Sequence, residues 1–333
     1  MANLALTFAA QDYEHTRALA DGRVKAEGIG LTCLDLFPAF TFQRMLGKRE
    51  FGLSEMAMTL YFSTLDEDDP PFIAIPVFPC RVFRHAAIFV RDGGSVREPK
   101  DLIGKRVGEF FFYGHDAGVW AKGVLSSEYG VRHDSYSYFI GGLGERPFGP
   151  QEWVPSRPPA HIKLEHIGPT RTLDRMLEAG EIDALVAPVA PPSLLRGENK
   201  VRRLFENYEE VERGYFKKTG VFPIMHTLVI RRDIHRDNPW VARALYQAFK
   251  EAKKVALERY RGGAFNSHTT FSLPWLTPHQ DSVRALMGDD WWPYGVASNR
   301  ATIDAFARYH HEQGLSKRLL TPKDLFAPET LDD

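Results

Sequence analysis

The 333-residue sequence contains only two cysteines, Cys33 and Cys80. So few cysteines exclude a disulfide framework and a cysteine-based zinc knuckle. Cys80 borders a run of cations, but we expect it to be a small buried hydrophobic residue. An excess of charge is also lacking, since 42 basic residues face 43 acidic ones and the formal net charge is -1. Without a basic block, nothing favours nucleic acid or an anionic membrane surface as a partner.

Long hydrophobic runs are absent as well. No segment approaches the roughly 18 apolar residues that a bilayer-spanning helix needs. Residues 1–15 have no basic start, a short apolar run and no small-residue cleavage site, so we expect a cytoplasmic protein. A phosphate loop and a dinucleotide fingerprint are missing too, which argues against a nucleotide cofactor. The sequence leaves open whether the chain forms a homo-oligomer.

What the sequence does contain is a group of cations at residues 78–91, FPCRVFRHAAIFVR. Arg81, Arg84 and His85 lie between two apolar runs, IAIPVF and AAIFV, that are typical of strands. A guanidinium group is rarely buried without a partner, and its planar fork suits a carboxylate. These cations therefore predict a site for an anion. Alternatively, the arginines pair with internal acids such as the DEDD run at 66–69.

Strand and helix patterns alternate along the chain. We expect strands at 4–10, 28–36, 73–78, 86–90, 107–112 and 184–189, and helices at 38–51, after 115 and after 171. The order strand, helix, strand, helix predicts a parallel sheet with right-handed crossovers.

A second apolar crossover lies at 218–233, KTGVFPIMHTLVIRRD. Two crossovers predict an α/β protein of two lobes, each a mostly parallel sheet flanked by helices, with residues 1–85 plus 227–333 in one lobe and 86–226 in the other. The cleft between the lobes is the expected ligand site.

Three strings carry a resemblance to a known family: FPCRVFRHAAIFVR, GVFPIMHTLVIRRD and, at 289–315, DDWWPYGVASNRATIDAFARYHHEQGL. The chain resembles the 4,5-dihydroxyphthalate decarboxylase family, and its order of elements is similar to the type II periplasmic-binding-protein fold. The resemblance covers essentially the whole chain. It implies removal of one carboxyl group from 4,5-dihydroxyphthalate in aromatic-acid breakdown, giving protocatechuate and carbon dioxide. A solute-binding protein for a small organic anion and an enzyme of pyrimidine-precursor synthesis are the alternatives.

The implied chemistry sets requirements for the site. Direct loss of carbon dioxide would leave an aryl carbanion, so a feasible route first protonates the ring carbon while an ionised para hydroxyl supplies electrons. That route needs an acid near the carboxylated carbon and a base near the phenol. Arginine forks would hold the carboxylates, and an apolar pocket favours release of neutral carbon dioxide. Because the ring is its own electron sink, we expect no cofactor.

Metal binding has no support in the spacing of possible ligands, since the sequence contains no HExxH motif. Alternatively, Asp12, Glu55, His85 and His115 could converge on a divalent ion.

Four residues are candidates for proton transfer. His85 and His226 lie at the two crossovers and would face the cleft from either lobe as an acid-base pair. Alternatively, each is a hydrogen-bonded core histidine. His115 lies in a turn before a helix, and is otherwise an exposed turn residue. Glu55 could accept the phenolic proton, and is otherwise a solvated acid.

Seven further residues are predicted to hold the substrate: Asp12, Tyr13, Arg81, Arg84, Tyr113, Asp116 and Arg171. Asp12 and Tyr13 follow the first strand, and ligands of open α/β sheets bind beyond the carboxyl ends of strands. Asp116 opens a helix, where free backbone amides attract carboxylates. Either aspartate could instead cap its helix, and Arg171, expected to clamp from the second lobe, could instead pair with Asp174.

Overall fold

Two β-sheets organise the chain in the computed structural model, which describes residues 3–144, 153–154, 157–263 and 271–332. The strand order is β2-β1-β3-β11-β4 in the first sheet and β10-β5-β9-β6-β7-β8 in the second. The strands are β1 (Leu4–Ala10), β2 (Ile29–Asp35), β3 (Leu53–Ala57), β4 (Phe72–Arg81), β5 (Ile88–Arg91), β6 (Arg106–Phe110), β7 (Ser137–Gly141), β8 (Leu164–His166), β9 (Ala184–Val186), β10 (Val201–Arg203) and β11 (Ile224–Arg231).

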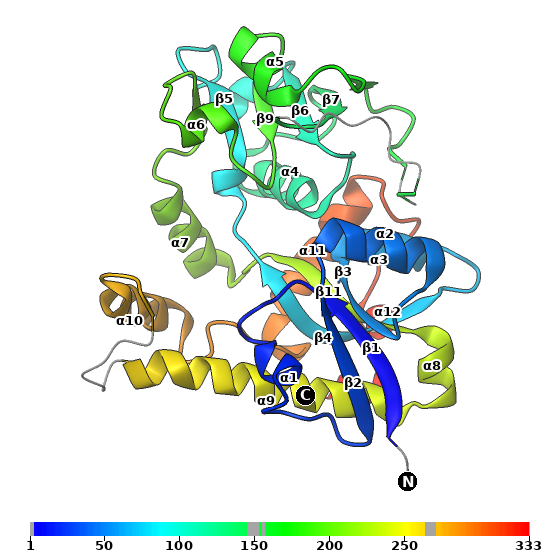
Figure 1. The fold of residues 1–333 in the computed structure, drawn as a ribbon. Helices are drawn as coiled ribbons and strands as arrows, with labels where there is room; N and C mark the ends of the chain where they lie inside the picture. The colour runs from blue at the N-terminus through cyan, green and yellow to red at the C-terminus, as the bar shows by residue number, and fades with distance from the viewer. Residues whose placement is uncertain (1–2, 145–152, 155–156, 264–270, 333) are drawn as a thin grey trace.

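Helices cover both sheets (Figure 1). They are α1 (Arg17–Ala20), α2 (Pro38–Lys48), α3 (Met58–Thr64), α4 (Asp116–Tyr129), α5 (Leu173–Ala179), α6 (Pro192–Leu195), α7 (Tyr208–Thr219), α8 (Arg232–Asp237), α9 (Trp240–Gly263), α10 (Leu276–Met287), α11 (Arg300–Glu312) and α12 (Pro322–Leu325). Short 3-10 turns are η1 (His85–Ala87), η2 (Pro99–Leu102), η3 (Ala297–Asn299) and η4 (Pro328–Thr330). The predicted α/β class with two lobes is confirmed, as the two sheets form separate lobes (Figure 1).

Both sheets are mixed. In the first, β1 is parallel to β2 and β3, as the alternating pattern predicted, but β11 enters antiparallel between β3 and β4. In the second, β6 is parallel to β7 and β9, whereas β5 and β10 run antiparallel to their neighbours. The antiparallel pairs involve β5 and β11, the strands that follow each passage of the chain between lobes. Each lobe is thus less uniformly parallel than the sequence pattern predicted.

The chain passes between the lobes twice. β4 continues through η1 into β5, and α7 leads back to β11 (Figure 1). Arg81 and Ile224 are paired in the ladder of β4 and β11, so the outgoing and returning segments lie side by side. The residue boundaries predicted for the two lobes stay a prediction.

The core of the first lobe lies between its sheet and α9. Leu228, Val229 and Ile230 of β11 are fully buried, as is Phe249 of α9, whose ring meets Phe8 of β1 edge to face at 5.2 Å between ring centroids. Continuous apolar runs suit strands that are covered on both faces. Among the described residues, no helix is both long and apolar enough to cross a membrane.

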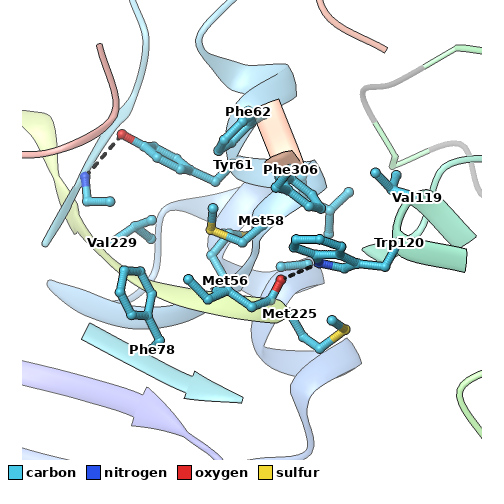
Figure 2. Packing of buried hydrophobic residues seen from close by; sticks show 14 of the residues in the cluster. Met56, Met58, Tyr61, Phe62, Phe78, Val119, Trp120, Met225, Val229 and Phe306 are labelled. Atoms are coloured by element: carbon cyan, nitrogen blue, oxygen red, sulfur yellow. Dashed lines mark hydrogen bonds between the residues drawn. The ribbon is translucent and has the colours of Figure 1, made fainter. Parts of the chain in front are cut away.

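Helix α4 joins the two lobes. It belongs to the second lobe, yet its residues from Asp116 to Leu125 are all buried. Figure 2 shows Trp120 of α4 against Phe306 of α11, with its indole nitrogen donating to the backbone carbonyl of Ile224 at 2.8 Å. A helix that is buried on all sides must be covered by several elements. The amino-terminal end of α4 is thereby held against the first lobe.

Candidate active site

Glu55 of β3 is the centre of a buried polar cluster. Its side chain is fully buried. The Tyr13 hydroxyl and His226 Nδ1 each lie 2.5 Å from Glu55 Oε1, and the backbone N–H of Gln11 donates to Oε2 at 3.1 Å. A buried carboxylate is costly unless it is paired and hydrogen-bonded, and three donors meet that need. The loop after β1, β3 and β11 thus converge on one carboxylate.

His226 is held in its charged form. Burial alone lowers its pKa, but Cys80 and Glu55 outweigh burial and raise the pKa well above the ordinary value. The imidazolium therefore donates from Nδ1 to Glu55, and its Nε2 lies 3.9 Å from Oδ2 of Asp116. The edge-to-face ring of Phe42 lies 5.1 Å away, between ring centroids. A cation between two carboxylates, beside an apolar ring, is a group that can donate a proton.

Asp116 reaches this cluster from the other lobe. It is the first residue of α4, and its Oδ1 accepts the backbone N–H of Thr59 at 2.8 Å. The alternative role of helix cap is not seen, because His115 occupies the cap position and makes no side-chain capping bond. Burial raises the pKa of Asp116 to about 6, against the opposing effects of His226, the Thr59 amide and Arg84. A carboxyl group with such a pKa can exchange protons near neutral pH.

The turn before Asp116 is strained and tightly held. Phe111 and Gly114 both have positive φ angles, 73° and 86°. A side chain at Gly114 would be strained at this φ angle and would displace the Leu315 side chain, whose Cδ1 would lie 2.6 Å from the added Cβ atom. The Gly114 N–H donates to Glu109, which also forms a fully buried ion pair with Lys122 at 2.8 Å. Residues held in sparsely populated conformations cluster at functional sites.

Arg84 brings an uncommitted cation to the same place. Its guanidinium is buried, and its Nε donates to the sulfur of Met225 at 3.1 Å. Within the described residues it forms no ion pair, although Cys80, Asp116 and Glu212 lie close enough to oppose the lowering of its pKa by burial. A buried guanidinium is costly unless its charge and its N–H groups find partners. Arg84 is therefore the best candidate in the cluster for holding a carboxylate of a ligand.

Arg81 differs from its neighbour. Its guanidinium donates to the carbonyl oxygens of Phe222 at 2.7 Å and Pro293 at 3.1 Å, and it stacks 4.5 Å from the Phe222 ring centroid. Burial lowers its pKa to about 9. The contacts of Arg81 and Arg84 within the described chain include none with the acidic run at 66–69. Arg81 thus ties the crossover to the segment around residue 293.

The other two candidate histidines are neutral. His85 packs against the rings of Phe205 and Tyr215, each 5.3 Å away between centroids, and burial lowers its pKa to about 4. These contacts include no member of the cluster. Burial also lowers the pKa of His115 well below the ordinary value, helped by Lys122 and Arg84. His115 is buried rather than an exposed turn residue, and its ring lies near Arg84.

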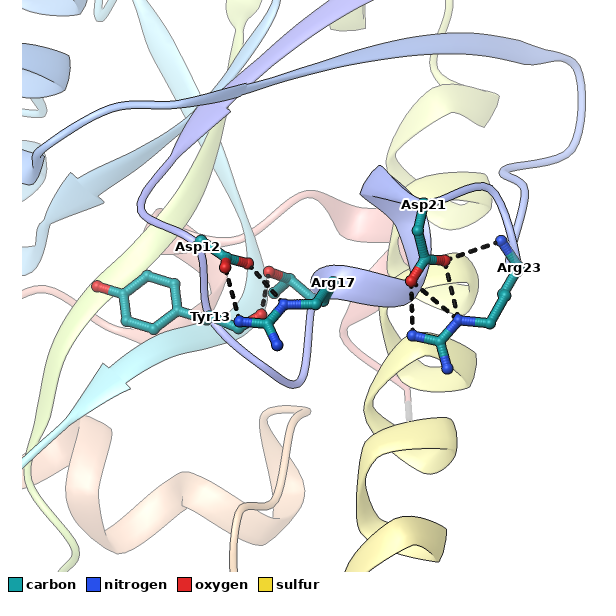
Figure 3. Close-up of polar contacts among 6 residues, drawn as sticks. Asp12, Tyr13, Arg17, Asp21 and Arg23 are labelled. Atoms are coloured by element: carbon teal, nitrogen blue, oxygen red, sulfur yellow. Dashed lines mark hydrogen bonds and ion pairs between the residues drawn. The ribbon is translucent and has the colours of Figure 1, made fainter. Parts of the chain in front are cut away.

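Two predicted binding residues lie at the surface. Asp12 forms an exposed ion pair with Arg17 at 2.6 Å rather than capping a helix. Figure 3 shows Asp12 turned toward Arg17, while the ring of Tyr13 points the other way. Arg171 pairs with Glu181 at 2.5 Å and not with Asp174. The described contacts of Asp12 and Arg171 include no member of the cluster.

Tyr113 packs against Lys122 of the buried Glu109–Lys122 ion pair. Lys122 Nζ lies 3.8 Å from the centroid of its ring, and the Tyr113 hydroxyl donates to the Gln313 carbonyl at 3.4 Å. The structure therefore brings together five of the eleven predicted residues: Tyr13, Glu55, Arg84, Asp116 and His226.

Cys80 and Phe42 join the cluster although neither was among the predicted site residues. Cys80 faces His226 in the ladder of β4 and β11 and is only partly buried, which corrects the expected role of a buried hydrophobic residue. It raises the pKa of both Tyr13 and His226, so its sulfur lies close to both. Its place beside the cations was the available signal. Nothing in the sequence marked Phe42.

Two further points concern a possible metal site and an open groove. Across the described residues, no three His, Cys, Asp or Glu side chains are arranged to hold a metal ion. An open groove of about 1120 Å³ is lined by Leu4, Gly28, Trp240 and Arg243, among others. It lies at the start of β1, whereas Tyr13 follows the end of that strand, so this groove is not the site of the cluster.

Several solved structures share this architecture. The alkanesulfonate-binding protein SsuA from Xanthomonas axonopodis pv. citri has a TM-score of 0.51 at 14% identity and covers 98% of this chain and 99% of its own. A putative sulfonate-binding protein from Methylobacillus flagellatus KT has a TM-score of 0.54 at 13% identity, covering 98% and 93%. The desulfurization enzyme DSZB has a TM-score of 0.50 at 13% identity, covering 98% and 97%. The architecture is the two-lobed periplasmic-binding-protein-like fold.

Sequence comparison identifies the family. No protein-family model matches the chain. A 4,5-dihydroxyphthalate decarboxylase from Comamonas testosteroni is 34% identical over 332 residues, which cover 100% of this chain and 99% of that protein. A 4,5-dihydroxyphthalate decarboxylase from Pseudomonas putida is 30% identical over 217 residues, or 65% of this chain and 83% of that protein. The chain belongs to the 4,5-dihydroxyphthalate decarboxylase family, as the resemblance implied.

Proposed function

We propose that this protein is a carboxy-lyase that converts 4,5-dihydroxyphthalate to protocatechuate and carbon dioxide without a cofactor. Membership of the decarboxylase family supports the reaction and substrate. The observation that carries the assignment to this cluster is the His226 imidazolium between Glu55 and Asp116, next to the uncommitted guanidinium of Arg84. This arrangement offers a proton donor and an anion-binding group in one place.

Substrate binding would rest on Arg84. A substrate carboxylate that replaces the weak contact with the Met225 sulfur gains a charge-assisted hydrogen bond in a buried setting. Tyr13, in the loop after β1, is hydrogen-bonded to Glu55, and the Glu55 carboxylate could accept the phenolic proton of a substrate there. The ring of Phe42 supplies an apolar wall beside His226. An aromatic diacid with two hydroxyl groups has the complementary chemistry.

The reaction then follows from proton delivery. The ionised para hydroxyl pushes electron density onto the ring carbon that bears the carboxylate, and His226 transfers its proton to that carbon. The bond to the carboxylate breaks, its electron pair returns to the ring, and carbon dioxide leaves. Asp116, whose pKa burial raises to about 6, can return a proton to His226 through Nε2. Glu55 keeps the imidazole oriented through Nδ1.

The test is turnover in deuterium oxide. Purified protein incubated with 4,5-dihydroxyphthalate should release carbon dioxide, and the product should carry deuterium at the vacated ring carbon, as read by NMR spectroscopy. Binding of 4,5-dihydroxyphthalate without release of carbon dioxide would contradict the proposal and favour the solute-binding alternative.

A further inference from the structure

The thiol of Cys80 has no part in the reaction above, yet it lies within the cluster. Cys80 is paired with His226 across β4 and β11. Its influence on the pKa of His226, Tyr13 and Arg84 places its sulfur among two cations and a phenol. It is partly exposed, whereas Val77 and Phe78 earlier on the same strand are fully buried. A reagent that enters the site can therefore reach it.

Two cations beside a thiol favour its reaction with electrophiles. The sulfur is the nucleophilic atom of cysteine, and an electrophile can reach it when the thiol is partly exposed. Arg84 is also a buried side chain with no ion pair among the described residues, so it attracts an anionic reagent to the same place. Cys33 offers the opposite environment. It lies on β2, and burial raises its pKa.

We propose that Cys80 is a thiol-modification site inside the candidate active site, and that it captures the ortho-quinone form of a catechol. The inference deepens the proposed function and rests on it for the class of reagent. The proposed substrate and product both carry adjacent hydroxyl groups, and dioxygen oxidises such rings to ortho-quinones with loss of two electrons and two protons. A quinone that keeps the carboxylate would be drawn to Arg84 as the substrate is.

The modification balances without a further reactant. The Cys80 sulfur attacks an unsubstituted ring carbon, and the carbon–sulfur bond forms as an electron pair moves to a quinone oxygen. The thiol proton and the proton of the attacked carbon end on the two oxygens. The ring becomes a catechol again, now bound to Cys80, and the adduct occupies the site.

The experiment compares the two cysteines in the whole protein. The wild-type chain and the Cys33→Ser and Cys80→Ser variants are treated with iodoacetamide, and separately with the ortho-quinone made from 4,5-dihydroxyphthalate by periodate. Peptide mass spectrometry then measures the labelling rate at each thiol. Cys80 should react at least about tenfold faster than Cys33. Cys33→Ser should keep the fast phase, and Cys80→Ser should lose it. The quinone adduct should abolish binding of 4,5-dihydroxyphthalate by calorimetry.

Equal labelling rates at Cys33 and Cys80, or an adduct at Cys80 that leaves binding intact, would overturn the inference. Since both readings come from wild-type protein, they do not depend on how the variants fold. Protection by 4,5-dihydroxyphthalate tests the proposed function separately. Fast labelling of Cys80 that this compound does not slow would support the modification site while counting against the proposed substrate.

Discussion

Glu55 and His226 lie 171 residues apart in the sequence, and Oε1 of the one is 2.5 Å from Nδ1 of the other. β3 and β11 are neighbours in the first sheet, with Leu228 opposite Glu55 and His226 opposite Ala57. The returning strand β11 therefore places His226 beside a carboxylate on its neighbour β3. Cys80 and Glu55 together raise the pKa of His226 by more than burial lowers it, so the histidine is an imidazolium. The proposed reaction depends on this charge.

Replacing His226 with Gln should separate binding from chemistry. Glutamine can still bond to Glu55 but cannot donate a proton to carbon, so kcat should fall by roughly 10² to 10⁴ fold while the Kd for 4,5-dihydroxyphthalate stays close to the wild-type value. Steady-state kinetics and calorimetry measure the two quantities. His85→Gln is the matched control, since the His85 ring packs against Phe205 and Tyr215 and its ring contacts within the described chain include no member of the cluster, so its variant should keep wild-type kcat. Wild-type turnover by His226→Gln would mean that another group supplies the proton.

Arg84→Ala should weaken substrate binding, whereas Arg81→Ala should lower stability. Removing the uncommitted Arg84 should weaken binding of 4,5-dihydroxyphthalate by about 2 to 4 kcal/mol, and Arg84→Lys should restore only part of it because lysine has no fork. Arg81 holds the carbonyls of Phe222 and Pro293, so Arg81→Ala should mainly lower the free energy of unfolding. Calorimetry and urea denaturation distinguish the two. An Arg84→Ala protein that binds as tightly as wild type would remove Arg84 from the site.

Ionisation of Asp116 should make the protein less stable as pH rises. Burial raises the pKa of Asp116 from 3.8 to about 6, so the folded state binds this proton more tightly than the unfolded state. The stabilising contribution is complete below pH 3.8 and is lost as pH rises through 6. Asp116→Asn keeps an acceptor for the Thr59 amide but cannot ionise. Its stability relative to wild type should therefore increase by up to about 3 kcal/mol between pH 4 and pH 7.

Urea denaturation of both proteins across that pH range checks the sign. A constant difference between Asp116→Asn and wild type would show that Asp116 titrates at the same pH in the folded and unfolded chains.

The buried pair of Glu109 and Lys122 should support both stability and the turn before Asp116. Lys122→Met leaves a buried carboxylate without its cation and should lower the free energy of unfolding by about 3 to 5 kcal/mol. The double variant Glu109→Gln with Lys122→Met removes both charges and should recover part of that loss while keeping a hydrogen-bond acceptor for Gly114. Urea denaturation measures the three proteins. A double variant that is less stable than Lys122→Met would contradict this account.

Dialysis against a strong chelator should leave decarboxylation intact. No three suitable ligand groups converge in the part of the chain that the structure describes, and the ring serves as its own electron sink. Carbon dioxide release before and after dialysis is the measurement. Loss of turnover that a single divalent ion restores would show that the reaction needs a metal.

The sequence by itself determined the two-lobed α/β class and the family, but not the antiparallel strands of the two sheets. The strand at 4–10 was predicted with the bounds that β1 has, and the apolar runs around the cations became β4 and β5, because continuous apolar stretches specify buried strands locally. Arg84, Glu55 and His226 could be proposed as site residues because a charged or titratable side chain within an apolar run is itself a signal.

Only the tertiary structure decided which of the candidates meet. The pattern at residues 81–85 could not distinguish Arg81, which bonds to two carbonyls, from Arg84, which has no ion pair among the described residues, because those partners come from residues 222, 225 and 293. The same holds for the histidines, since His85 and His226 occupy similar apolar runs, but of the two only the His226 ring is hydrogen-bonded to a carboxylate within the described residues. The protonation state of a side chain and the groups that it can contact depend on residues far apart in the chain. The local sequence does not encode those contacts.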